Sequence, residues 1–147
     1  MNTHYLNEAK FVSKADDPIM RVIGWFWPAF TVRFWTTYRL PFMRRARICH
    51  PPAASVWHPG IIAHEMFHVQ QLKPWYGPLW MGLALVLPLP VLFSGRWWVE
   101  RGAYLADIKA GRYSVEGAVD VLWNGYGWPL PRSWMRRWLE KKLRLTS

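Results

Sequence analysis

The sequence has few of the features that usually assign a function at once. Cys49 is its single cysteine, which excludes an intrachain disulfide and leaves the redox compartment open. It has no glycine-rich phosphate loop, no nucleophile elbow and no specific nucleic-acid-binding motif. Residues 1–10 lack the apolar core of a signal peptide, so we expect a cytoplasmic protein by default, with association with a membrane or virion as the alternative.

Acidic residues are also scarce. The 147 residues include 9 Asp and Glu against 19 Lys and Arg, a formal net charge of +10. Hydrophobic residues make up 52% and charged ones only 19%, which excludes disorder and suits one domain with one sizeable core. The positive charge, together with 12 tryptophans, predicts an acidic partner such as an anionic membrane surface or an assembly protein. A solvated basic surface without a specific partner is the alternative.

Charge is absent altogether from residues 74–95. These 22 residues are long enough to raise the question of a membrane span, but several helix breakers interrupt them. The breakers are Pro74, Gly77, Pro78, Gly82, Pro88 and Pro90. We expect a buried helix and a proline-bent loop here, with a hairpin that dips into a membrane as the alternative.

One short stretch carries a recognisable chemistry. Residues 60–73 place His64 and His68 four positions apart, with Glu65 directly after the first histidine. On a helix, positions i and i+4 share a face, so both imidazoles can reach one cation. In the H-E-x-x-H arrangement two histidines bind zinc, and the glutamate is the general base toward a metal-bound water. Pro59 suits the first turn of this helix.

A catalytic zinc site needs a third protein ligand. Between His68 and Asp120 no further histidine occurs, and the acidic residues are Glu100, Asp107, Glu116 and Asp120. Glu100 lies in the sequence W-W-V-E-R-G-A-Y-L-A-D, which predicts a second helix with a small residue one turn after the glutamate. That small residue, Ala103, would let the two helices lie close, so Glu100 is the expected third ligand.

The motif A-H-E-M-F-H-V-Q-Q followed by E-R-G-A-Y resembles the gluzincin branch of zinc metallopeptidases, over residues 36–109. It is most similar to compact zincin-like domains of bacteria and phages. The resemblance implies an α+β fold in which a short antiparallel sheet packs on the metal-binding helices. It implies Zn²⁺ as the cofactor, His64, His68 and Glu100 as its ligands, and Glu65 as the catalytic base.

The sequence departs from the larger gluzincins at one position. They carry an aspartate four residues after the ligand glutamate, where this chain has Tyr104. The carboxylate that would orient a histidine is therefore unassigned. We expect Asp107 to be a poor substitute, because it lies two turns from Glu100, about 10 Å along the helix axis.

The resemblance predicts a zinc-dependent hydrolase, a metallopeptidase acting on a peptide or protein substrate. Candidates for stabilising the oxyanion are Tyr104, Tyr113, Tyr126 and His58. The alternative is a catalytically silent zincin-like scaffold that serves as a binding or structural component of a membrane-associated or virion-type assembly.

Outside the motif, the hydrophobic pattern and the positions of helix-capping and turn-forming residues predict the remaining elements of a single domain. Residues 1–17 are expected to form a flexible arm, and residues 31–38 a strand paired antiparallel with residues 42–49. By analogy with zincins, residues 43–49 would line the substrate cleft. Ser114 is expected to cap a helix over residues 115–123. The basic amphipathic helix within 131–147 is expected to cover its own core, with docking on an anionic membrane as the alternative.

Overall fold

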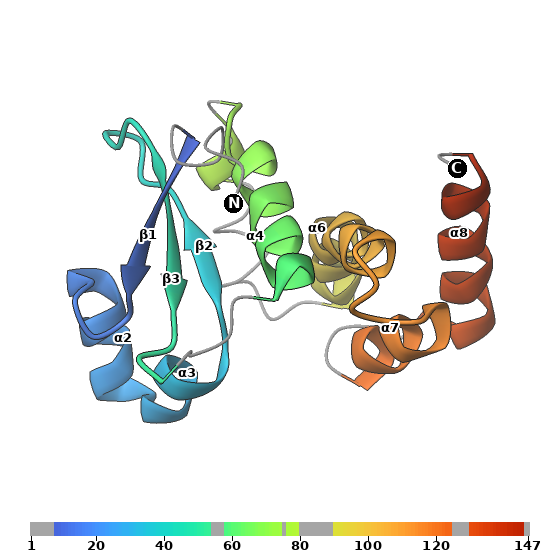
Figure 1. Cartoon of the computed structure of the whole chain (residues 1–147), viewed down its shortest axis with the longest axis horizontal. Helices are drawn as coiled ribbons and strands as arrows, with labels where there is room; N and C mark the ends of the chain where they lie inside the picture. Colours follow the sequence, from blue (N-terminus) through green and yellow to red (C-terminus); the bar gives the residue numbers. More distant parts are fainter. Residues whose placement is uncertain (1–7, 54–57, 75, 80–89, 125–129, 146–147) are drawn as a thin grey trace.

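The computed structural model describes residues 8–53, 58–74, 76–79, 90–124 and 130–145, and has an α+β fold (Figure 1). A small sheet with two short helices lies on one side, two long helices lie in the middle, and two further helices lie on the other side. In chain order the elements are β1 (Ala9–Ser13), α2 (Pro18–Phe26), α3 (Pro28–Arg33), β2 (Thr36–Tyr38), β3 (Ala46–His50), α4 (Pro59–Gln71), α6 (Pro90–Lys109), α7 (Val115–Leu122) and α8 (Arg132–Arg144).

The sheet is mixed, with strand order β1-β3-β2. β2 pairs antiparallel with β3, as expected, but β1 pairs parallel with β3, with Ala9 opposite Ala46. The prediction of a purely antiparallel sheet was wrong because β1 lies in the segment expected to be a flexible arm. Helices α2 and α3 supply the long crossover that a parallel pair requires. β3 is thus the central strand with both edges paired, so no substrate chain can pair with residues 46–50, and β2 is the edge strand next to α4.

Residues 31–38, predicted to be one strand, divide into a helix end and a three-residue strand. Pro28 occupies the first turn of α3, where its fixed φ and missing N–H favour a helix start. Gly24 does not interrupt α2, which continues to Phe26. The pattern that predicted a strand over residues 31–38 was therefore too short to separate strand from helix.

Asp17 joins α2 to the sheet. Its Oδ1 accepts hydrogen bonds from the backbone N–H groups of Ile19 and Met20, which caps α2. Its Oδ2 accepts from the Tyr38 hydroxyl at 2.7 Å and from Arg47 at 2.8 Å. Burial alone would raise the pKa of Asp17, but these hydrogen bonds and the Arg47 charge outweigh it and lower the pKa. The two helices before β2 are therefore fixed to the sheet through an ionised carboxylate.

Helices α4 and α6 pack closely, as Ala103 predicted. Ala103 is fully buried, and Gly102 faces the ring of Phe67 so closely that a Cβ there would come within 2.1 Å of a ring atom. Gly102 thus permits an approach that a larger residue would block. On its other side α4 packs on the sheet, in a core made by Ala9, Ala46, Ile48, Met66, Val69 and Leu72.

The predicted C-terminal helices are both present. Ser114 caps α7 by accepting the Gly117 N–H at 3.1 Å. Met135 and Leu139 of α8 are fully buried in a cluster with Trp97, so α8 covers its own core. Ion pairs from Arg136 to Glu116 and from Arg132 to Asp120 join α8 to α7.

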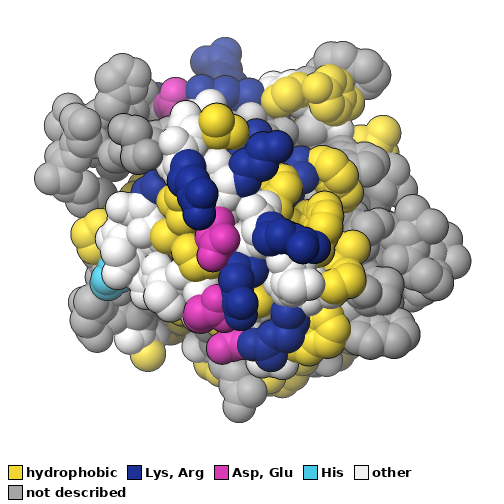
Figure 2. Space-filling model, turned by 90° about the vertical axis from the view of Figure 1, so that its right-hand side faces the viewer, with side chains coloured by type: hydrophobic (Ala, Val, Ile, Leu, Met, Phe, Trp, Pro, Cys, Tyr) yellow, Lys and Arg dark blue, Asp and Glu magenta, His cyan; other side chains and the backbone are white. Residues whose placement is uncertain are grey.

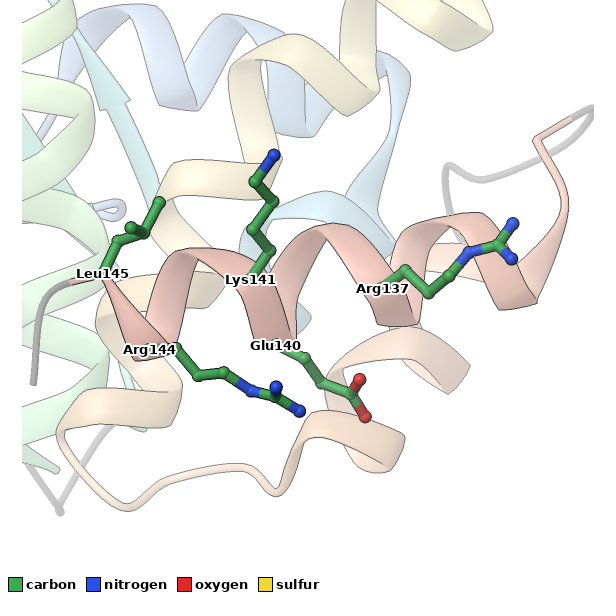
Figure 3. A pocket seen from close by; sticks show the side chains of 5 residues that line it. All are labelled: Arg137, Glu140, Lys141, Arg144 and Leu145. Atoms are coloured by element: carbon green, nitrogen blue, oxygen red, sulfur yellow. The ribbon is translucent and has the colours of Figure 1, made fainter.

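The outer face of α8 is basic. Figure 2 shows lysine and arginine side chains gathered in a band on this face of the molecule, with a few acidic groups between them. Arg137, Lys141 and Arg144 project from this helix and, with Glu140 and Leu145, line a hollow on the surface (Figure 3).

Half of the uncharged stretch 74–95 lies outside the described residues, since 75 and 80–89 are not among them. Its last part belongs to α6, which begins at Pro90. Within the described parts of the chain, every helix is too short or too polar to cross a membrane.

Candidate metal centre

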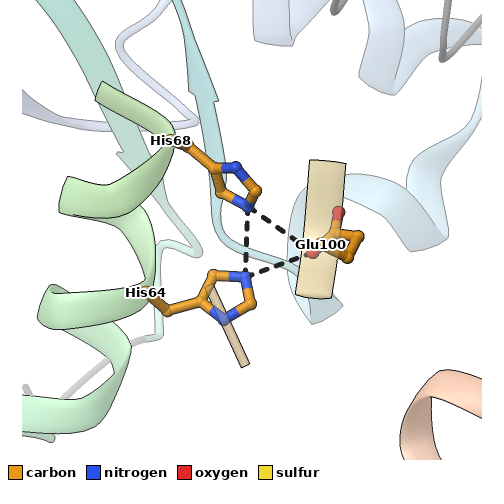
Figure 4. Close-up of side chains that lie close together, drawn as sticks. All are labelled: His64, His68 and Glu100. Atoms are coloured by element: carbon orange, nitrogen blue, oxygen red, sulfur yellow. Dashed lines mark hydrogen bonds and ion pairs between the residues drawn. The ribbon is translucent and has the colours of Figure 1, made fainter. Parts of the chain in front are cut away.

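Three of the predicted site residues converge between α4 and α6 (Figure 4). The Nε2 atoms of His64 and His68 lie 3.2 Å apart. An Oε2 atom of Glu100 lies 3.4 Å from the first nitrogen and 3.5 Å from the second. The three atoms thus form a nearly equilateral triangle, built from one helical i, i+4 pair and one carboxylate on the facing helix.

The outer ring nitrogens determine what the inner ones offer. His64 Nδ1 lies 2.7 Å from Asp107 Oδ2, and His68 Nδ1 lies 2.8 Å from Gln71 Oε1. Both partners are acceptors, so each Nδ1 donates its hydrogen, and in the neutral rings each Nε2 carries a lone pair. The Gln71 amide is oriented by its own NH₂, which donates to the Val99 carbonyl at 2.9 Å.

Three electron-pair donors therefore point into one small space, which is stable only if a cation or protons lie between them. Tetrahedral zinc with ligand bonds of about 2.0–2.1 Å has its ligand atoms roughly 3.3–3.4 Å apart. The observed separations of 3.2, 3.4 and 3.5 Å bracket that value. The residues present therefore fit a zinc ion without rearrangement of the two helices.

The electrostatics of the cluster also favour a cation. Burial opposes a charge on His64, but hydrogen bonds with Asp107 and Glu100 and the charge of Glu65 outweigh it and raise the pKa of His64 to about 10. The pKa of His68 is likewise raised, against burial, chiefly by Glu100. Burial would raise the pKa of Glu100, but the two histidines lower it to about 2. The surrounding carboxylates thus stabilise positive charge on or between the imidazoles.

The prediction for Asp107 was wrong, and this difference matters most for the site. It was expected to be too far along α6, yet its carboxylate is fully buried and bonded to His64. The His64 ring lies along α6 and bridges two turns, with Nε2 toward Glu100 and Nδ1 toward Asp107. Arg112 holds the same carboxylate at 3.1 and 3.3 Å. Asp107 therefore orients a predicted ligand, the role that the sequence left unassigned.

Glu65, the predicted base, is held by a residue that sequence reasoning missed. The Thr37 hydroxyl of β2 donates to Glu65 Oε2 at 2.6 Å. Glu65 is buried, and its charge acts on both histidines of the cluster. No local signal could have identified Thr37, because it is 28 residues away in sequence. Gln71, also missed, stands at i+3 from His68, a spacing that would have indicated contact.

Comparison with known proteins adds no relative. No protein-family model matches this chain, and no curated protein or solved structure is significantly similar to it. The assignment of the cluster therefore depends on the motif and the geometry alone.

The four candidate oxyanion residues have different positions. Tyr104 is buried with its ring edge-on to His64, at 5.1 Å between centroids. Tyr113 lies beside it, at 5.9 Å from the Tyr104 ring. His58 caps α4, since its Nδ1 accepts the Gly60 N–H at 3.1 Å. Tyr126 lies outside the described residues. Tyr104 and Tyr113 are thus grouped near the cluster, whereas His58 is bonded at the start of the helix.

Replacing Asp107 with alanine is expected to weaken zinc binding about 10- to 100-fold, the usual effect of losing a partner that orients a metal-bound histidine. Asp107→Asn keeps an acceptor toward His64 but not the charge, so its effect should be smaller. Zinc affinity is measured by competition with a chromophoric chelator. The matched control is Glu116→Ala, which removes an exposed carboxylate paired with Arg136 and should leave affinity unchanged. A folded Asp107→Ala protein with wild-type affinity would contradict the assignment.

Proposed function

We propose that this chain is a zinc-dependent hydrolase of the metallopeptidase type, in which His64, His68 and Glu100 hold zinc and Glu65 is the general base. The observation that supports the proposal best is the convergence of three electron-pair donors within 3.5 Å of one another. A helix motif alone would not require a carboxylate from α6 to complete this triangle.

The donor set favours zinc over the alternatives. Two imidazoles and one carboxylate suit zinc, while magnesium and calcium prefer oxygen ligands only. Three protein ligands leave a fourth position open, which is the pattern of catalytic rather than structural sites. When bound, zinc supplies a Lewis acid that polarises a carbonyl and lowers the pKa of water to about 7.

Glu65 has the contacts expected of a proton carrier. The bond from Thr37 uses Oε2, so we assign proton transfer to the other oxygen, Oε1. In this role Glu65 takes a proton from the attacking water and delivers it to the departing amine. Because the carboxylate is buried and already oriented, little reorganisation accompanies the transfer.

The edge strand β2 is the proposed place for the substrate backbone. β2 is an edge strand that pairs with β3 along one side, and its Thr37 contacts Glu65 of α4. An extended peptide that pairs with an exposed strand edge gains main-chain hydrogen bonds without regard to its sequence. Pairing along β2 would bring a peptide bond near Glu65, and this supports a peptide as the substrate class.

The test combines metal content with turnover. Equimolar zinc should co-purify with the protein, and a mixed peptide library analysed by mass spectrometry should show cleavage. Removing zinc with a chelator should abolish cleavage, and returning zinc should restore it. A protein that binds zinc but cleaves nothing in the library would favour the catalytically silent scaffold instead. A folded protein that binds no zinc would overturn the zinc-dependent hydrolase.

A further inference from the structure

Helices α2 and α3 carry an exposed apolar surface that has no role in the metal centre. Six large hydrophobic residues in or next to these helices are exposed and are here called the aromatic surface: Val22, Trp25, Phe26, Trp27, Val32 and Phe34. Three of them are consecutive in the sequence and all are largely exposed: Trp25 is 80% exposed, Phe26 76% and Trp27 60%. Large aromatic groups gathered on one exposed surface usually mark a contact site.

The start of α2 is fixed to the rest of the fold. Met20 of α2 is buried, and the carboxylate of Asp17 caps the helix and fixes it to the sheet. Trp25 and Phe26 face outward, whereas Met20 is buried. Their rings contact each other, with centroids 4.8 Å apart. The exposed residues are thus held in position by the fold.

The chemistry of this surface fits a membrane interface. Tryptophan and phenylalanine on one face of a short helix are typical of segments that lie in the headgroup region. Arg21 is exposed on the same helix, and the chain carries a net charge of +10. Anionic lipid attracts this charge, whereas a second copy of the chain is repelled by it.

We propose that the aromatic surface of α2 and α3 docks the protein on an anionic lipid bilayer, lying in the interface rather than crossing it. Among the described helices none could cross a membrane, which agrees with contact in the plane of the surface. The proposal is independent of the zinc chemistry, because none of the six residues belongs to the metal cluster.

Flotation of the full chain with vesicles tests the proposal. With phosphatidylcholine containing phosphatidylglycerol the protein should float, and with phosphatidylcholine alone it should float much less. Replacing Trp25, Phe26 and Trp27 together with serine should reduce the bound fraction at least tenfold. Phe42→Ser is the matched control, since Phe42 is 82% exposed in the β2–β3 connection at the opposite end of the sheet (Figure 1). Binding of this control should equal that of the wild type.

A fluorescent label reports the depth of contact directly. Cys49 is fully buried, and burial raises the pKa of its thiol to about 12, so it should not compete for a thiol-reactive dye. A polarity-sensitive dye on Phe26→Cys should shift to the blue on adding anionic vesicles, and the same dye on Phe42→Cys should not. Circular dichroism confirms that each variant is folded.

Three results would overturn the proposal. The first is a wild-type protein that floats with neither kind of vesicle. The second is unchanged flotation of the triple serine variant, or flotation that instead depends on Arg137, Lys141 and Arg144 of α8. The third is a wild-type dimer in sedimentation that the triple variant abolishes and that shows no lipid binding. This last result would make the aromatic surface an interface between copies of the chain.

Discussion

Glu65→Gln is expected to retain zinc and to lose peptide cleavage by about 10²- to 10⁴-fold, the usual contribution of a general base. Glutamine has nearly the same shape and can still accept a hydrogen bond from Thr37, as Glu65 Oε2 does at 2.6 Å. It cannot take a proton from water at neutral pH. The side chain is not one of the three converging ligands, so the metal content should stay equimolar. Initial rates on a cleaved library peptide measure the loss of activity, and the zinc content of the same sample shows whether the metal is retained.

Thr37→Val is the matched positioning variant. It keeps the shape of the side chain and removes only the hydroxyl that orients Glu65. We expect a smaller fall in kcat, with KM and zinc content unchanged, because the base is still present but less well oriented. Full activity in Glu65→Gln would show that another group takes the proton, and the mechanism would have to be abandoned.

The local part of the site could be predicted from the sequence. The i, i+4 spacing of His64 and His68 fixes their common face on any helix, and Ala103, one turn after Glu100, indicates a close helix pair. Proline at the start of α4 and serine before α7 mark helix ends through chemistry that acts within a few residues. These signals needed no knowledge of the tertiary fold.

The predictions that were wrong, and the contacts that were missed, involve residues far apart in the sequence. Asp107 reaches His64 only because α4 and α6 pack side by side, and axial distance along α6 alone was a poor guide. Thr37 reaches Glu65 through the pairing order of the sheet, which a sequence of three short strands does not specify. β1 was missed because its five residues pair in parallel with a strand more than thirty positions later. Such contacts have no local signature.

The largest effect on the metal is expected from Glu100→Ala, which should lower zinc affinity by more than the roughly 100-fold upper effect of losing an orienting partner. The two histidines hold the pKa of Glu100 at about 2, so at neutral pH the variant loses an anionic ligand. The two remaining imidazoles would face each other with Nε2 atoms 3.2 Å apart and no carboxylate beside both Nε2 atoms. Competition with a chromophoric chelator measures the loss.

Two further variants separate charge from shape. Glu100→Gln keeps an oxygen at the same position and removes the charge, so its zinc affinity should fall between those of the wild type and Glu100→Ala. Glu116→Ala removes a carboxylate that is paired with Arg136 on α8, and zinc should bind it as tightly as it binds the wild type. If a folded Glu100→Ala protein binds zinc normally while Asp107→Ala binds none, the third ligand is Asp107. The two-histidine motif would then remain, with a different carboxylate completing the site.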